Sequence, residues 1–247
     1  MKAHPMPRSQ QRPDSLSTPA ASLAKSGGSR RALRPRDPPP ARVNDPEGVK
    51  RDILKVATEE FSRQGYSGAR VDAIAARTRT SKRMIYYYFG GKEALYVRVL
   101  EEAYRKIRTV EARLNLEGLD PVAALRRLTG HTFDYYHANP EFVRLVMIEN
   151  IHHARHMKRS KAIQSLNVTV IDAIRELYRR GCADGLFRDG LDPVDIHMTI
   201  SALGILNVAN RATFSTIFKK DMASPAARAG RRAEIIEAVL LYVGRGR

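Results

Sequence analysis

The stretch TSKRMIYYYFGGKEAL, residues 80–95, combines side chains that are able to contact nucleic acid. Lys82 and Arg83 could each donate hydrogen bonds to guanine O6 and N7 or to a phosphate. The run Tyr86-Tyr87-Tyr88 offers flat apolar rings for thymine methyl groups and hydroxyls for phosphate. These residue types predict contact with double-stranded DNA. The alternative is a solvated Lys-Arg pair beside tyrosines that serve packing, with Tyr86 as the packing residue.

Three short helices and a long one are expected to position this stretch. Asp45-Pro46-Glu47 is typical of a helix start, with a cap, a proline in the first turn and an acid near the positive end of the dipole. Apolar residues then recur at helical spacing until Gly65 ends the helix. The apolar side of the long helix follows Gly90-Gly91. It consists of Leu95, Val99, Leu100, Ala103 and Ile107.

The second and third helices are separated by a tight turn. Thr78-Arg79-Thr80 ends the second helix, and Ser81 is a suitable cap for a third helix through about Tyr88. Ile85 and Phe89 are four residues apart, so both are expected to face a small core. This arrangement is a helix-turn-helix, in which the N-terminal residues of the last helix meet base edges in the major groove.

The segment IAARTRTSKRMIYYYFGGKEAL, residues 74–95, resembles the N-terminal motif of TetR-family transcriptional regulators. The pattern AxxxFSRQGY, residues 57–66, is similar to the first helix of that family. The resemblance is specific because many positions agree at fixed spacing. The matching residues are Ile74, Ala75, Ser81, Ile85, Tyr86, Tyr88, Phe89, Lys92, Glu93 and Leu95.

Two positions depart from the family pattern. The family turn usually contains Ala-Gly-Val where this chain has Thr78-Arg79-Thr80. If Arg79 must adopt a positive φ, the loss of glycine costs about 1 kcal/mol. The family often has Thr-Thr or Thr-Ser where this chain has Ala69-Arg70, which removes a cap worth about 1 kcal/mol. Arg70 is expected to replace the lost phosphate contact by charge.

The predicted DNA-binding residues come from the helix-turn-helix and its flanks. Lys92 belongs with them because the N-terminus of the next helix favours phosphate. The full set is Arg70, Ser81, Lys82, Arg83, Met84, Tyr86, Tyr87, Tyr88 and Lys92.

Residues 109–247 are predicted to be helical throughout. Helices are expected over 121–138, from Pro140, over 160–183, over 193–214 and over 231–243. The family resemblance implies a small-molecule-binding domain whose last two long helices form a homodimer. The alternative is that these helices only complete the core of a monomer.

A small-molecule site is predicted from polar and aromatic residues in this half, although most aromatic and Met side chains of a helical domain are core. Arg211, beside Asn207, could hold an anionic group of the ligand. The predicted set is His131, Tyr135, Tyr136, Phe142, Met147, Asn150, Asn207 and Arg211. His152 and His156, and Glu149 and His153, have the i,i+4 spacing of metal ligands, but the sequence HHARH is no hydrolytic zinc motif. Solvated or hydrogen-bonded histidines are the simpler interpretation, so no metal and no cofactor are predicted.

Charge and composition set the remaining expectations. The chain carries a formal net charge of +17, which indicates a polyanion or an acidic membrane surface as partner. Residues 1–44 are basic and rich in proline, so they are predicted to be a disordered tail. No run of 18 apolar residues occurs, so no membrane-spanning segment is expected, and no membrane is among the predicted partners. Cys182 is the single cysteine, which fits a reducing, cytoplasmic location.

The sequence therefore predicts an all-α protein with a helix-turn-helix domain over 45–108 and a ligand-binding and dimerisation domain over 109–247. The expected function is sequence-specific binding to a near-palindromic operator as a homodimer. The expected mode is repression that a small-molecule effector relieves. The alternatives are activation on the same fold, or non-specific nucleic-acid binding through the tail. No nucleophile–base pair, Gly-rich phosphate loop or metal motif occurs, so catalysis is not expected.

Overall fold

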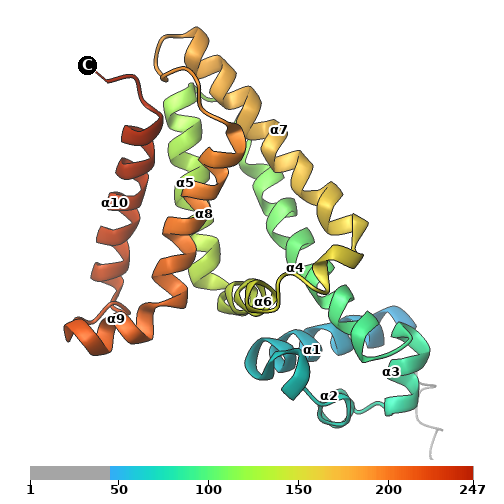
Figure 1. Ribbon diagram of the computed structural model, residues 1–247. Coiled ribbons are helices and arrows are strands. Elements are labelled where there is room, and N and C mark those ends of the chain that lie inside the picture. Colours follow the sequence, from blue (N-terminus) through green and yellow to red (C-terminus); the bar gives the residue numbers. More distant parts are fainter. Residues whose placement is uncertain (1–44, 247) are drawn as a thin grey trace, which may run out of the picture. The chain divides into compact units, whose positions relative to one another are not determined.

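The computed structural model describes residues 45–246, and within this range the regular structure is helical (Figure 1). The all-α prediction is therefore confirmed. The 3₁₀ turns are Ala112–Leu114 and Met157–Arg159. The helices are α1 (Pro46–Gly68), α2 (Val71–Arg77), α3 (Lys82–Phe89), α4 (Lys92–Glu111), α5 (Pro121–Ala138), α6 (Pro140–Ile151), α7 (Lys161–Ala183), α8 (Pro193–Ala209), α9 (Arg211–Phe218) and α10 (Pro225–Val243).

Helix α1 begins where the sequence predicts. An Oδ atom of Asp45 accepts a hydrogen bond from the Gly48 amide at 2.8 Å, and Pro46 occupies the first turn. Gly65 interrupts the helix with φ 67° and ψ 176°, a conformation that disfavours any side chain. One further turn, to Gly68, follows this kink and turns the chain toward α2.

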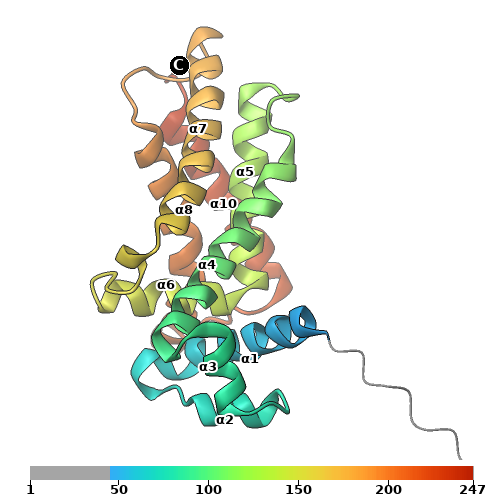
Figure 2. The ribbon, with the colours of Figure 1, turned by 90° about the vertical axis from the view of Figure 1, so that its right-hand side faces the viewer.

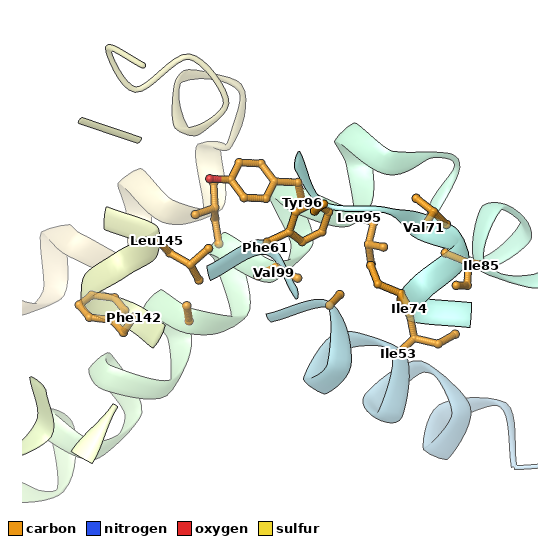
Figure 3. Packing of buried hydrophobic residues seen from close by; sticks show 14 of the residues in the cluster. Ile53, Phe61, Val71, Ile74, Ile85, Leu95, Tyr96, Val99, Phe142 and Leu145 are labelled. Atoms are coloured by element: carbon orange, nitrogen blue, oxygen red, sulfur yellow. The ribbon is translucent and has the colours of Figure 1, made fainter. Parts of the chain in front are cut away.

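The first three helices pack on the start of α4 around one apolar core. Ile53, Phe61, Ile74, Ile85 and Leu95 have no solvent exposure, and Figure 3 shows them gathered between these helices. The same cluster continues along α4 and into α6 through Tyr96, Val99, Phe142 and Leu145. The helix-turn-helix is therefore joined to the second half of the chain by buried apolar contacts.

A second core holds the later helices together. Helix α5 packs against α8 and α10, and α7 packs against α4 and α8 (Figures 1 and 2). Leu125, Ile174 and Val239 are wholly or almost wholly buried among them. Gly204 allows α8 to pack closely on α5 within the chain, because a Cβ at this position would lie 2.9 Å from the Tyr136 ring.

The chain after 193 departs from the prediction. The single helix expected over 193–214 is wrong, because α8 ends at Ala209 and a separate α9 begins at Arg211. Asn210 sits between them with φ −99° and ψ 4°, outside the helical region. The last helix begins at Pro225 rather than at 231, because Ser224 caps it by accepting from the Ala227 amide at 3.3 Å.

Across residues 45–246, no helix is both long enough and apolar enough to span a bilayer. The tail predicted over 1–44 lies outside the described residues, so the structure does not test it.

Candidate nucleic-acid interface

Helix α3 presents polar side chains outward because one residue anchors it inward. The Ser81 hydroxyl accepts from the Met84 amide at 3.2 Å, which fixes the first turn. Ile85 is completely buried, so the helix has one defined inner side. The side chains of the other predicted positions, Lys82, Arg83, Met84, Tyr86 and Tyr87, are exposed, and Tyr87 is 78% exposed.

In the turn before α3, Arg79 has the positive φ that the family pattern, with glycine at this position, led us to consider. Arg79 adopts φ 52°, in the left-handed region. The Thr80 amide donates to the Ala75 carbonyl at 3.1 Å, which closes the turn. An arginine in this conformation costs about 1 kcal/mol relative to glycine. The exposed guanidinium at this position adds positive charge next to α3.

The two cations of α3 differ in their surroundings. Lys82 Nζ lies 3.3 Å from an Asp72 carboxylate oxygen and 5.9 Å from the centre of the Tyr86 ring. Arg83 has no ion-pair partner among residues 45–246. Lys82 must therefore exchange an existing contact before it binds DNA, whereas Arg83 is available for a base edge or a phosphate.

The three tyrosines divide differently from the expectation. Tyr88 is half-buried against the apolar core, while Tyr86 is 39% exposed. The packing tyrosine is therefore Tyr88 rather than Tyr86, because position 88 lies nearer the side of the helix that carries Ile85. Lys50 of α1 places Nζ 5.5 Å from the centre of the Tyr88 ring. Lys50 is not in the predicted DNA-binding set, because its place at the start of α1 gives no sequence signal of proximity to α3.

The two flanking cations bracket the helix-turn-helix. Arg70 is exposed at the N-cap of α2, and its amide donates to Glu60 Oε1 at 3.3 Å. Lys92, in the first turn of α4, donates to the Ser67 carbonyl at 3.3 Å and lies 5.0 Å from the centre of the Tyr66 ring. The positions of Arg70 and Lys92 are compatible with phosphate binding, and their contact with DNA stays a prediction.

The predicted small-molecule residues do not form a single site. Tyr135, Tyr136 and Phe142 come together, with Tyr136 stacked on Phe142 at a centroid distance of 5.8 Å. The others are dispersed. His131 lines a groove between α5 and α10. Met147, Asn150 and Arg211 are exposed, and Asn207 Oδ1 bonds to His137 Nε2 at 2.9 Å.

A buried polar cluster near these aromatic rings was not predicted from the sequence. Arg108 and Glu111 form an ion pair on α4 with side-chain exposures of only 8% and 6%. Burial, reinforced by the Arg108 guanidinium, lowers the pKa of His197 to about 4. Burial also raises the pKa of Tyr136 to about 12. An i,i+3 Arg–Glu pair usually indicates a solvated helix face, so no sequence signal marked this one as buried.

The histidines after α6 are not arranged as metal ligands. Helix α6 ends at Ile151, so the i,i+4 spacing of these residues has no helical meaning there. His156 Nδ1 instead lies 2.9 Å from Glu149 Oε1, and both side chains are buried. The hydrogen-bonded interpretation therefore describes His156.

Comparisons with known proteins agree with this geometry. Residues 53–99 match the model described as "Bacterial regulatory proteins, tetR family", and residues 121–239 match "Tetracyclin repressor-like, C-terminal domain". The chain belongs to the TetR family. The predicted resemblance is thus confirmed, and the function of the chain is transcriptional regulation through DNA binding.

Individual relatives extend this result. The chain is 36% identical to the HTH-type transcriptional repressor NicS of Pseudomonas putida over 188 residues, which cover 76% of this chain and 89% of NicS. A crystal structure of the transcriptional regulator SCO4942 of Streptomyces coelicolor superposes with a TM-score of 0.62 at 30% identity, covering 80% of this chain and 99% of that one. The structure of AibR in complex with isovaleryl coenzyme A and operator DNA shares the fold at a TM-score of 0.57 and 17% identity, covering 77% and 97%.

Proposed function

We propose that this TetR-family regulator is a homodimeric repressor that binds a near-palindromic operator and is released by a small-molecule effector. It acts in the cytoplasm, where the operator lies. The observation that carries the proposal is the presentation of α3. Ile85 anchors this helix in the core, and Arg83, Tyr86 and Tyr87 project from it into solvent. A major-groove helix needs this arrangement of a fixed inner side and a polar outer side.

The outer faces of α8 and α10 support the homodimer. Val194, Met198, Ala202 and Leu206 recur every four residues along α8 and are exposed in one chain. Leu241 of α10 is 74% exposed. An exposed apolar stripe of this kind marks an interaction surface, and a second copy would cover it. The two α3 helices of such a dimer must lie roughly 34–36 Å apart to enter successive major grooves.

Release by an effector follows from linkage. An effector that favours a dimer with the wrong α3 separation must bind that state more tightly by several kcal/mol to shift the population fully. Operator DNA must then weaken effector binding by the same factor. The relative NicS, which is 36% identical, is named as a transcriptional repressor. Equal effector affinity with and without operator would refute release as the mechanism.

Fluorescence anisotropy separates the repressor from the non-specific alternative. The full chain is titrated onto the DNA upstream of its own gene and onto a scrambled duplex of equal length, at several salt concentrations. The proposal predicts a preference for the natural sequence of at least about 10³-fold, typical of specific regulators. It also predicts that removing residues 1–44 preserves this preference. Equal affinity for both duplexes, lost when the tail is removed, would support non-specific binding and contradict the proposal.

A reporter assay separates repression from activation. The upstream DNA drives a reporter gene in cells with and without the regulator. We expect reporter expression to rise when the regulator is absent and to fall when it is restored. A fall in reporter expression when the regulator is absent would show that it is an activator instead.

The exposed cations of α3 give a residue-level test. If Arg83 reads a base, Arg83→Ala relaxes the preference at one operator position by about 1–3 kcal/mol. If it binds phosphate, the loss is uniform across operator variants and the salt dependence becomes weaker. The same comparison applies to Lys82→Ala. The control is Arg175→Ala, which removes an exposed cation of α7 and is expected to leave operator affinity unchanged.

A further inference from the structure

A buried ion pair on α4 lacks half of its hydrogen bonds. Arg108 Nη1 donates to Glu111 Oε2, and both side chains are more than nine-tenths buried. Within residues 45–246, Arg108 Nε and Glu111 Oε1 are both buried without any hydrogen-bond partner. One atom is a donor and the other an acceptor. Buried polar atoms in native proteins are nearly always paired, so a donor and an acceptor left side by side point to a partner outside the chain, either ordered water or a ligand.

Aromatic and neutral polar side chains of α4, α5 and α8 lie within the electrostatic reach of the pair. Burial dominates the pKa shifts of His197, which is lowered, and of Tyr136, which is raised, and the Arg108 charge acts on both groups. This places α8 and α5 within the electrostatic reach of Arg108. Tyr104 of α4 and Tyr136 each lie against Phe142, with centroid distances of 5.3 and 5.8 Å. The Tyr136 hydroxyl donates to Ser201 Oγ at 3.3 Å. The rings of Tyr104, Tyr136 and Phe142 give the cluster an aromatic side.

The charges of the cluster are already balanced. Arg108 is paired with Glu111, and His197 is neutral at physiological pH because burial lowers its pKa. An anionic or cationic ligand would therefore add an unpaired buried charge, which is strongly unfavourable. A neutral ligand that places an acceptor toward Arg108 Nε and a donor toward Glu111 Oε1 would satisfy both orphan atoms without that penalty.

We propose that the cluster of Arg108, Glu111 and the surrounding tyrosines is the effector site, and that it takes a small, flat, uncharged compound with a hydrogen-bond acceptor beside a donor. A cyclic amide is the simplest such group. The inference rests on the proposed function, because it assigns the effector of the proposed repressor. It also replaces most of the dispersed set predicted from sequence, from which it retains Tyr135, Tyr136 and Phe142.

The test compares three probes of similar size on the full-length protein: 2-pyridone, benzoate and benzylammonium. Arg108→Met with Glu111→Leu removes the polar pair and keeps its bulk. The matched control is Arg105→Met with Glu102→Leu, because that pair has the same spacing on the same helix but is 41% and 32% exposed. At about tenfold its Kd, we expect 2-pyridone to raise the melting temperature of the parent and the control by about 4 °C. The apolar variant should show no rise.

A second variant tests the charge argument and folds with less disturbance. Glu111→Gln keeps the shape but leaves Arg108 unpaired in charge. We expect this variant to lose about tenfold in affinity for 2-pyridone and to gain a measurable melting shift with benzoate, because an anion now balances the guanidinium. A benzoate shift in the parent that exceeds the 2-pyridone shift would overturn the neutral class.

Equal shifts in the parent and the apolar variant, or no shift with any probe, would overturn the site itself. Operator binding is measured on the same samples by anisotropy. If the parent binds operator specifically but no probe distinguishes it from the apolar variant, only this inference fails. If the parent shows no operator preference, the proposed function fails, whatever the probes do.

Discussion

Replacing Glu149 with glutamine removes one charge from the buried joint between α6 and the helix-turn-helix. The Glu149 side chain is 1% exposed and accepts three hydrogen bonds from the segment that follows α6. Its donors are the His156 amide at 3.1 Å, His156 Nδ1 at 2.9 Å and the Met157 amide at 3.0 Å. One carboxylate thereby fixes a turn in which His153 and Ala154 both have positive φ.

The expected change in the free energy of unfolding follows from the two backbone amides that donate to Glu149. Both donate to Glu149 Oε2, and a glutamine oxygen could accept from both at the same place. The bonds would then lose their charge assistance, at a cost of about 1 kcal/mol each. Glu149→Gln is therefore expected to lower the free energy of unfolding by about 2 kcal/mol. Glu149→Ala, which leaves the buried donors without an acceptor, should cost about 4 kcal/mol.

The joint also bears on DNA binding. The His156 ring lies 4.4 Å from the Tyr66 ring and 4.9 Å from the Tyr96 ring, measured between centroids. Tyr66 in turn lies beneath Lys92, a predicted phosphate contact. Loosening the turn at Glu149 should therefore weaken operator binding as well as stability.

Urea unfolding of the full chain, followed by circular dichroism, measures the stability change. The control is Glu141→Gln, in the first turn of the same helix, with an expected change within about 0.5 kcal/mol. A Glu149→Gln variant as stable as the parent would refute the reasoning, because the two backbone hydrogen bonds to Oε2 could not then depend on the charge.

Three further predictions concern single positions. Arg79→Gly relieves the positive φ and should raise the free energy of unfolding by up to about 1 kcal/mol in urea; a loss of stability would contradict the strain argument. Ile85→Ala removes a fully buried side chain and should cost about 2–5 kcal/mol in the same assay, whereas Met84→Ala on the exposed side should cost far less. The folded pKa of His197, about 4, lies below its unfolded value, so the unfolded state takes up a proton first as the pH falls. The free energy of unfolding is therefore highest above about pH 6.5 and decreases as the pH falls toward 4. The parent should lose about 2 kcal/mol between pH 7.5 and 5 through this group, and His197→Gln should show a flatter profile; identical profiles would refute the assignment.

Local signals made the DNA-binding half predictable. Ser81 as a cap and Ile85 as an inward residue follow from capping preference and helical period, and both appear in the structure. The positive φ of Arg79 followed from a single departure from the family pattern. The sequence did not show which of the three adjacent tyrosines packs against the core and which are exposed. A shift of one residue turns a side chain by about 100° around the helix, so a small error in the helix phase changes the answer.

Long-range packing made the other half harder to predict. The pair Arg108 and Glu111 has the same spacing as Arg105 and Glu102 reversed along the helix, yet only the first is buried. The difference arises from which side of α4 faces the neighbouring helices α5 and α7, and no local sequence pattern specifies that side. Asn210 likewise ends α8 without a glycine or proline to announce it.

The central claim is sequence-specific operator binding through α3 in a dimer. Selection of bound duplexes from a random DNA pool by the full-length protein, with excess competitor, tests it most directly. The account predicts enrichment of one near-palindrome whose half-site centres lie about one helical turn apart. Recovery of unenriched sequences by the parent protein would contradict it.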